Sequence, residues 1–388
     1  KSGKKVYKFG FGQSPFPVPE SIVSALKNNA NKNTYLPMQG LEELRSAIAK
    51  QLSHDNNNDF VAEDIIVGPG TKELMFLTQI AFEGEILLPA PSWVSYKPQA
   101  VIAKNKVHWI QTSSSSNWFP TAEQLENKIK SIKNQNLILF INSPNNPSGL
   151  LCKNLQEIAE VAKKHKLIIL SDEIYSRLTF DNQYKSISNF YPEGTIVSTG
   201  LSKWCGAGGW RLGFFAIPKQ LEELKKSLKI LCSESFTSVS APIQYAAIEA
   251  YTGDHSVYLK NIKKILSGVG NYVYENLKSN IINITKPEGG FYILVEFTNA
   301  TTTQCFNPER KQWAFEILER LDLPTSIFPE VVESGCELAM IEGKVGEDIG
   351  CKEIPVIAPA THDTGSAVAA IPAQRTVTTF EKPTSETD

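Results

Sequence analysis

The chain has 388 residues, of which 39 are Lys or Arg and 41 are Asp or Glu, so its formal net charge is −2. This length favours more than one domain, and the balanced charge removes any broad electrostatic argument for nucleic acid or an anionic membrane as a partner. No apolar run approaches the roughly 20 residues that span a bilayer, so we expect no membrane segment.

Predicted elements of two kinds alternate between about residues 60 and 250. Short apolar runs predict strands at 64–68, 85–89, 137–142, 167–173 and 195–200. Apolar residues at helical spacing predict helices at 72–82, 154–166, 221–231 and 241–251. Strands that are apolar throughout and alternate with helices are typical of an α/β fold with a mainly parallel sheet sandwiched by helices.

The pattern changes after this alternating region. The stretch EGGFYILVEF at 288–297 predicts a strand that enters a second domain. The Thr-rich, polar end of the chain at 374–388 has the composition of a disordered tail.

Six cysteines are scattered without paired spacing, and there are five histidines. We therefore expect no structural metal site. Free thiols favour a reducing compartment, so we expect a cytoplasmic protein. The first residue is Lys1 and not methionine, so we expect the natural N-terminus to be missing.

Polar motifs follow the predicted strands, and in open parallel sheets ligands bind beyond the carboxyl ends of strands. GPGTKELMF at 68–76 runs from a Gly-rich turn into a helix, which suits an anion cradle or equally a plain helix cap. Trp93 offers an aromatic ring on which a flat ligand could stack, although a single tryptophan is more often a core residue. Asn146 follows another strand, and alone it fits a turn.

Asp172, Tyr175 and Lys203 complete the set. Asp172 ends an apolar strand, where a carboxylate needs a cationic partner or solvent. Tyr175 comes within reach of the same place if the chain turns helical there. A desolvated lysine such as Lys203 is the usual protein nucleophile for an aldehyde, although a lone lysine is ordinarily a surface residue. Together the motifs fit a ligand with an anion, a flat ring, a basic ring nitrogen and an aldehyde, as in pyridoxal phosphate.

These residues resemble the class I and II aminotransferases of pyridoxal-phosphate (PLP) fold type I, with the aspartate aminotransferase branch the most similar. The matching stretches, in family order and spacing, are YLPMQGLEELRSAIAKQL, GPGTKELMF, PAPSWVSY, NSPNNPSG, SDEIYSRL and GLSKWCGAGGWRLGF. The resemblance covers about residues 8–297. It implies an N-terminal segment at 1–30, a PLP-binding large domain at 31–280 and the start of a truncated small domain at 281–297.

The resemblance implies roles for individual residues around the cofactor. Lys203 would bond to its aldehyde carbon and move the proton at the substrate Cα. Asp172 would keep the ring nitrogen protonated, Tyr175 and Asn146 would hydrogen-bond the ring oxygen, and Trp93 would stack on the ring.

Further roles concern the phosphate, the substrate and a second subunit. The residues that would hold the phosphate are Arg211, Ser202 and the backbone of Gly70, Thr71 and Lys72. Tyr35 would reach the phosphate of a neighbouring subunit, which implies a homodimer. Gly12 and Asn146 would lie beside the substrate.

Two departures from the family pattern stand out. Gly200 lies three residues before Lys203, where many relatives have serine, and we expect little effect because other relatives also lack it. The family also has a C-terminal arginine that binds the substrate carboxylate. None of Arg310, Arg320 and Arg375 has the matching context, so we expect impaired activity.

The segment 298–373 resembles instead a fragment of the FGGY family of sugar kinases, of the rhamnulokinase type. Its most specific piece is HDTGSAVAA, in which Asp363 would match the base that accepts the sugar hydroxyl proton. An ordinary strand-to-helix turn capped by His362 and Asp363 also fits this piece. About 75 residues cannot form both lobes of such a kinase, so we expect no kinase activity.

The leading hypothesis is therefore a PLP-dependent aminotransferase that moves an amino group between an L-amino acid and a 2-oxo acid. Three alternatives stay open at this point. One is a carbohydrate-kinase fragment fused to an inactive PLP domain, the second is a PLP lyase of the same fold, and the third is a non-catalytic fusion product.

Overall fold

The computed structural model describes residues 12–56, 58–134, 136–181, 184–277 and 283–296, and short strands further on. The chain divides into two units, Lys1–Phe297 and Thr298–Asp388. In the second unit, β10 (Phe306–Asn307) pairs with β11 (Gln312–Trp313), and β12 (Glu337–Met340) pairs with β13 (Pro355–Ile357), both antiparallel.

Seven strands of the described residues form one sheet in the first unit, in the order β1-β7-β6-β5-β4-β2-β3. Their bounds are β1 Ile65–Gly68, β2 Glu85–Ala90, β3 Lys106–Gln111, β4 Leu137–Asn142, β5 Ile168–Asp172, β6 Thr195–Gly200 and β7 Gly213–Ala216. All neighbours are parallel except at β7, which runs antiparallel to both β1 and β6. A small hairpin of β8 (Asn283–Ile284) and β9 (Val295–Glu296) follows.

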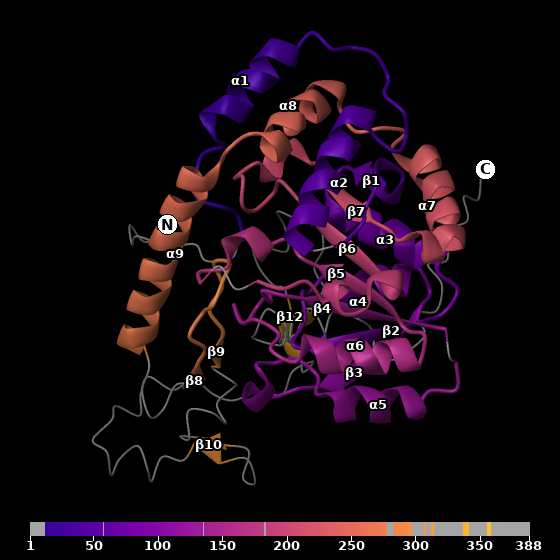
Figure 1. Cartoon of the computed structure of the whole chain (residues 1–388). Coiled ribbons are helices and arrows are strands. Elements are labelled where there is room, and N and C mark those ends of the chain that lie inside the picture. Colours follow the sequence, from indigo (N-terminus) through magenta and orange to yellow (C-terminus); the bar gives the residue numbers. More distant parts are fainter. Residues whose placement is uncertain are drawn as a thin grey trace, which may run out of the picture. The chain divides into compact units, whose positions relative to one another are not determined.

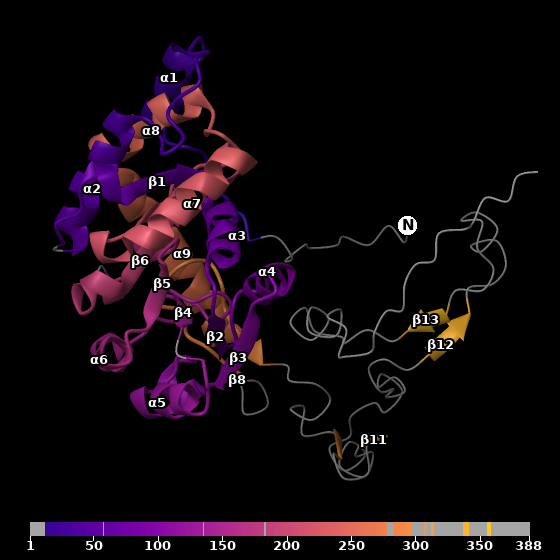
Figure 2. The same cartoon turned by 90° about the vertical axis from the view of Figure 1, so that its right-hand side faces the viewer.

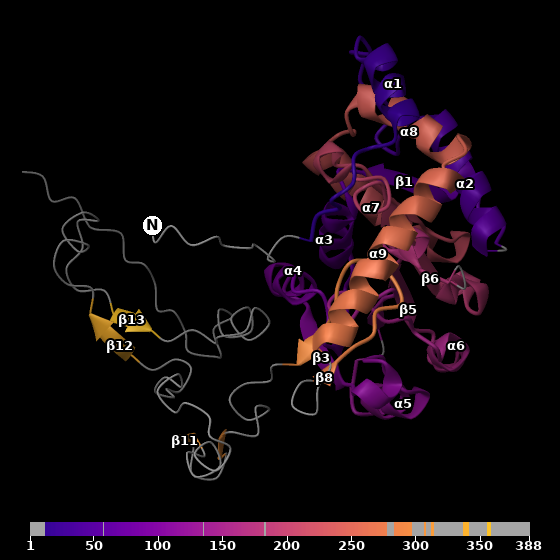
Figure 3. The same cartoon turned by 90° about the vertical axis from the view of Figure 1, so that its left-hand side faces the viewer.

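Helices cover both faces of this sheet. Their bounds are α1 Glu20–Asn29, α2 Glu42–Asn56, α3 Thr71–Ala81, α4 Tyr96–Ile102, α5 Ala122–Lys130, α6 Leu155–Lys164, α7 Glu222–Ser235, α8 Ala241–Thr252 and α9 Ser256–Leu277. Figure 2 views the unit from the side of α3, α4 and α7, and Figure 3 views it from the opposite side, with α9 in front. Helices α1 and α8 lie side by side at one end, and α5 lies at the other (Figure 1).

The sheet divides the core because successive side chains of a strand point to opposite faces. Ile66, Phe140 and Phe215 belong to the core under α3, α4 and α7. Leu139 and its neighbours on the other face pack against α5 and α6, while Val67 packs against α1, α2 and α8. Strands β1, β4 and β7 are buried along their whole length, as expected for a sheet covered on both faces.

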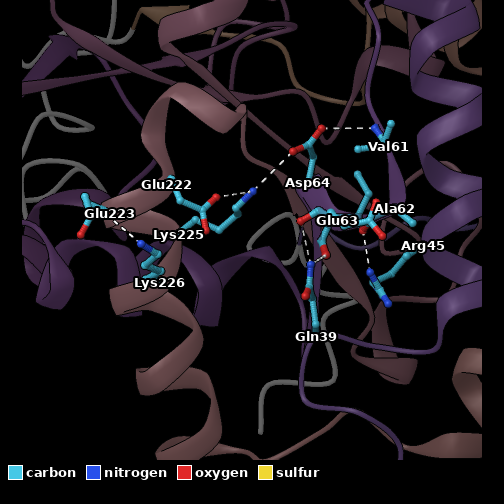
Figure 4. A network of polar contacts seen from close by, with 11 residues as sticks. Gln39, Arg45, Val61, Ala62, Glu63, Asp64, Glu222, Glu223, Lys225 and Lys226 are labelled. Atoms are coloured by element: carbon cyan, nitrogen blue, oxygen red, sulfur yellow. Dashed lines mark hydrogen bonds and ion pairs between the residues drawn. The ribbon is translucent and has the colours of Figure 1, made fainter.

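A polar network fixes the start of β1 (Figure 4). Asp64 accepts a hydrogen bond from the backbone N–H of Val61 and forms a 3.4 Å ion pair with Lys225 of α7. Gln39 and Arg45 donate to backbone carbonyls of residues 62–65. Asp64 and Lys225 are both buried. The network therefore positions β1, whose other end carries the turn at Gly68–Gly70.

The α/β fold class expected from the sequence is confirmed. The five predicted strands form, and the helices predicted at 221–231 and 241–251 are α7 and α8. The pattern analysis did not predict α1, α2, α4, α5, α9, β3 or β7. It overestimated the strand at 288–297, of which only Val295–Glu296 is a strand in the described residues. No described helix is long and apolar enough to cross a membrane.

Candidate active site

The carboxyl ends of the central strands meet at one edge of the sheet. Asn142 at the end of β4 is in register with Asp172 at the end of β5, and Asp172 with Ser198 of β6. Gly213 at the start of β7 pairs with both Gly68 and Gly200. The loops that carry Lys203 and Arg211 therefore begin and end at this same edge.

A cavity of about 530 Å³ opens at this edge. The residues that line it are Gly12, Gln13, Thr71, Lys72, Trp93, Asn142, Asn146, Asp172, Ile174, Tyr175, Ser202, Lys203, Gly208, Gly209, Arg211 and Tyr292. Most of the sequence-predicted site residues are among them. Gly70 lies just outside, against the Arg211 guanidinium, and Asp363 lies outside the described residues.

The floor of the cavity is the Asp172 carboxyl, which is 4% exposed. The Tyr96 hydroxyl donates a 2.7 Å hydrogen bond to Asp172 Oδ2. Burial raises the pKa of Asp172 to about 6, although the hydrogen bond from Tyr96 opposes this rise. The charge of Lys203 in the same cavity also lowers the Asp172 pKa, but less than the hydrogen bond from Tyr96 does, and no ion pair to Asp172 is found within the described residues.

Tyr175 stands beside this floor. It precedes the short 3-10 turn Ser176–Leu178, so the chain turns as the sequence suggested. Its hydroxyl donates to the Tyr292 hydroxyl at 3.2 Å, and it also hydrogen-bonds Asn146. Burial raises the Tyr175 pKa well above its ordinary value, which keeps this phenol a neutral donor.

Lys203 extends into the cavity from the loop after β6. Its ammonium donates to the Gly12 carbonyl at 2.5 Å and lies 5.7 Å from the centre of the Tyr175 ring. Desolvation lowers the Lys203 pKa; the Asp172 charge opposes this lowering, whereas Arg211 adds to it. A lowered pKa increases the fraction of free amine, the form that attacks carbonyl carbon.

The opposite end of the cavity is cationic. Thr71 begins helix α3 after Gly70, whose φ is +89°. Arg211 packs over that turn and donates to the carbonyls of Gly208 and Pro69, at 2.9 and 3.2 Å. Ser202 and Lys72 complete this end. Free N–H groups at a helix start, the helix dipole and a guanidinium together favour a bound anion.

Trp93 and Tyr35 lie in different surroundings. Trp93 lines the cavity, with Lys72 Nζ 5.1 Å from its ring centre and Tyr96 edge-on at 5.3 Å. Tyr35 is 87% exposed and is not among the residues that line the cavity of its own chain.

Sequence reasoning did not predict Tyr96, Asn142 or Tyr292, nor the lining residues Gln13, Ile174, Gly208 and Gly209. Tyr96 was within a quoted motif, three residues after Trp93, and its helical spacing from Trp93 was the available signal. Asn142 ends a predicted strand, and its Oδ1 accepts from the Asn146 N–H at 2.7 Å. Tyr292 reaches the site because the segment near Glu288 hydrogen-bonds the loop at Gly149, a long-range contact that no local pattern reveals.

The residues present fit pyridoxal phosphate. An anion-binding end, an amine of lowered pKa and a buried carboxyl with no ion pair in the described residues match its phosphate, its aldehyde and its ring nitrogen. A Cβ added at Gly70 would lie 2.3 Å from Arg211 Nη2, so this glycine leaves the space that the guanidinium occupies. Fold and site together define a PLP-dependent enzyme of fold type I.

Comparisons with known proteins agree with this assignment. The family model for aminotransferase class I and II matches residues 4–320. The aspartate aminotransferase of Bacillus sp. (strain YM-2) is 32% identical over 310 residues, which are 77% of each chain. The chain belongs to the class I and II aminotransferases, and it is a PLP-dependent transaminase.

Solved structures extend the comparison. Aspartate aminotransferase from Thermus thermophilus with maleate has a TM-score of 0.69 at 27% identity, over 75% of this chain and 77% of that one. The aromatic aminotransferase from Pyrococcus horikoshii OT3 has a TM-score of 0.68 at 31% identity, over 73% and 78%. A second family model, the N-terminal domain of the FGGY carbohydrate kinases, matches residues 284–370, in line with the resemblance of the C-terminal segment.

Proposed function

We propose that this chain moves an amino group between an L-amino acid and a 2-oxo acid, with aspartate as the first donor to test. The observation that carries the proposal is one cavity that combines Lys203, the buried Asp172 and the cationic end at Arg211. Relatives named for aspartate and for aromatic amino acids suggest these two donor classes.

The proposed roles follow the geometry of the cavity. Thr71, Lys72, Ser202 and Arg211 would hold the cofactor phosphate, with the backbone at Gly70 beside them. Asp172 would face the ring nitrogen and Trp93 would lie against the ring. When bound, the cofactor supplies an electron sink for the electrons released at the substrate Cα.

Lys203 would move the proton at the substrate Cα. As free amine it accepts that proton, and as ammonium it returns it, in the manner of a general base and acid whose pKa is near the working pH. The Tyr175 hydroxyl and the Asn146 side chain would hydrogen-bond the ring oxygen. The Gly12 carbonyl, which accepts from Lys203, would hold the ammonium at the substrate side of the cavity.

We also propose that the substrate carboxylate is bound weakly. Among the described residues that line the cavity, the cations are Lys72, Lys203 and Arg211, and all three have other tasks. Loss of one charge-assisted hydrogen-bonding partner weakens binding by about 10- to 100-fold. A raised KM with a smaller change in kcat is the expected signature.

A homodimer is part of the proposal. The exposure of Tyr35 and its place outside its own cavity are consistent with a contact to a second copy. Mixing Tyr35→Ala chains with Lys203→Ala chains tests it: shared sites recover activity in the mixed dimer, because one of its two sites then has both residues. The cytoplasmic location expected from the sequence stays a prediction.

Borohydride reduction in the presence of PLP, followed by peptide mass mapping, tests the site. We expect one pyridoxyl adduct at Lys203, while the exposed Lys72 in the same cavity stays unlabelled. Labelling spread over many lysines would contradict the proposal.

The reaction type needs its own assay. Incubation with L-aspartate and 2-oxoglutarate should give a new amino acid, whereas release of ammonia would indicate a lyase. ADP formation from ATP and a sugar, without amino-group transfer, would favour the kinase-fragment alternative.

A further inference from the structure

A second cavity, of about 390 Å³, lies against the segments that build the active site. Its lining includes Glu173, Ser176 and Trp204, the chain neighbours of Asp172, Tyr175 and Lys203. Each of these three segments therefore contributes one side chain to the active cavity and the next one to the second cavity. A ligand in the second cavity would contact the segments that carry the chemistry.

Arg177 provides an unpaired cation in this lining. Its guanidinium carbon lies 4.6 Å from the centre of the Trp204 ring and 5.8 Å from that of Tyr251. The side chain is half-buried, and within the described part of the chain no hydrogen bond or ion pair joins it to an acceptor. The two rings fix the guanidinium while its N–H donors stay available.

The Tyr251 hydroxyl is a second donor without an acceptor. It belongs to α8, lines the same cavity, and is buried with no hydrogen-bond partner in the described residues. Burial raises the pKa of Tyr251, so the phenol keeps its proton. A desolvated donor left unpaired destabilises a fold, and this one lies in the same lining as the Arg177 guanidinium.

Lys263 of α9 adds positive charge to the lining. Its pKa is lowered first by burial and next by the charge of Arg177, so the two cations repel each other, whereas the charge of Asp181 raises the Lys263 pKa. An anion bound beside them would remove this repulsion, independently of the other contacts that Lys263 makes.

Glu173 and Asp55 are the carboxyl groups in this lining that could oppose an anion. Glu173 is the buried one. Its oxygens are already engaged, because the hydroxyls of Ser171, Ser186 and Tyr184 donate to them. Asp55 lies toward the surface, where it pairs with His54 at 3.2 Å. Neither carboxyl group forms an ion pair with Arg177 in the described residues, so the guanidinium remains available to a ligand.

We propose that this second cavity binds a small carboxylate anion, with the Arg177 guanidinium and the Tyr251 hydroxyl as its donors. A planar guanidinium donates two parallel hydrogen bonds to a planar carboxylate. The volume lies within the range of known small-molecule sites. The Trp204 and Tyr251 rings hold the guanidinium in place.

Malonate titrations of the holoenzyme, followed by calorimetry, test this site. The cofactor is first reduced onto Lys203 so that no turnover occurs. We expect an Arg177-dependent binding event that Arg177→Gln weakens about tenfold or more and Tyr251→Phe weakens about threefold. Tyr258→Phe is the matched control, because that tyrosine lies outside the lining and donates to the Pro17 carbonyl.

A local readout comes from Trp204 fluorescence. Malonate should change the tryptophan emission of the holoenzyme, and Trp204→Phe should abolish that change. Equal isotherms for the unaltered chain and Arg177→Gln would overturn the proposal, as would a fluorescence change that persists in Trp204→Phe. If Arg177→Gln fails to fold, Tyr251→Phe decides the question, because it keeps the ring beneath the guanidinium.

Discussion

The two ends of the active cavity differ in how far their charged groups are exposed to solvent. At the cationic end, Arg211 and Lys72 are exposed, so their charges stay hydrated. The turn at Gly70 leaves the space that the Arg211 guanidinium occupies. At the floor, Asp172 is buried and its pKa is raised. The cationic end is ready for an anion at little cost to the fold. The floor carries a desolvation penalty that the Tyr96 hydrogen bond and the Lys203 charge offset only in part, which predicts that the two ends respond differently to substitution.

Asp172→Asn should give the largest effect and separate activity from stability. Loss of the carboxylate that stabilises a protonated ring nitrogen should lower kcat about 10²- to 10³-fold, as for other charge-stabilising groups. Without cofactor the variant should be more stable at pH 7. A pKa raised from 3.8 to about 6 corresponds to about 3 kcal/mol. Urea unfolding of both cofactor-free proteins measures this difference.

The free energy of unfolding should depend on pH in a direction that the raised pKa of Asp172 determines. Because the folded-state pKa is raised, the folded chain binds the Asp172 proton more tightly than the unfolded chain. The stability that this proton contributes is fully present below pH 4 and is lost as pH rises through about 6. Asp172→Asn should lack that decline. Glu173→Gln is the control. The pKa of Glu173 is about 7, so this variant should lose a decline in stability that lies at higher pH and should keep the one due to Asp172. Identical curves for Asp172→Asn and the unaltered chain would refute the account.

Gly70→Ala tests the shape of the cationic end. At a φ of +89° a Cβ is strained, and it would lie 2.3 Å from Arg211 Nη2, so the guanidinium must move. We expect cofactor affinity to fall about 100-fold, as for loss of a charged hydrogen-bonding partner and its backbone support. Equilibrium dialysis with PLP measures it. Gly209→Ala is the matched control in the same cavity, since its Cβ would meet nothing within 4 Å; equal losses in both variants would rule out this explanation.

The sequence predicted the residues that local patterns mark, and it did not predict those whose roles depend on long-range packing. Trp93, Asn146, Asp172 and Lys203 were found because they lie at or after the ends of strands β2, β4, β5 and β6, and strand ends can be read from local apolar runs. Tyr96 and Tyr292 were not found because their roles depend on packing: Tyr96 lies 76 residues from its partner Asp172 in the chain, and Tyr292 lies 117 from Tyr175. Helix α9 (Ser256–Leu277) lies beyond the region in which strands and helices alternate, so that alternation did not predict it, although its apolar residues recur at helical spacing.

Arg211→Lys should have a moderate effect on the cationic end. The charge is kept, but the paired donors are lost, and so is the contact with Pro69 and Gly208. We expect PLP to bind about tenfold more weakly, with kcat at saturating cofactor within a few-fold of the original. A fall in kcat that added PLP does not restore would show that Arg211 acts on the chemistry as well.

Tyr96→Phe should give the smallest effect and the most specific one. The phenol donates to Asp172 Oδ2 at 2.7 Å and holds the carboxyl pKa below the value that burial alone would give. Removing it should raise the Asp172 pKa further and move the acid limb of the pH–activity profile to higher pH. Activity should fall about tenfold near pH 6 and recover above pH 8, where the carboxyl is ionised in either case. A uniform loss at all pH values would instead mean that Tyr96 only supports packing against Trp93 and Phe140.

Tyr258→Phe is the control. Tyr258 is far from Asp172 in the chain and outside the cavity, so this variant should leave the pH–activity profile unchanged.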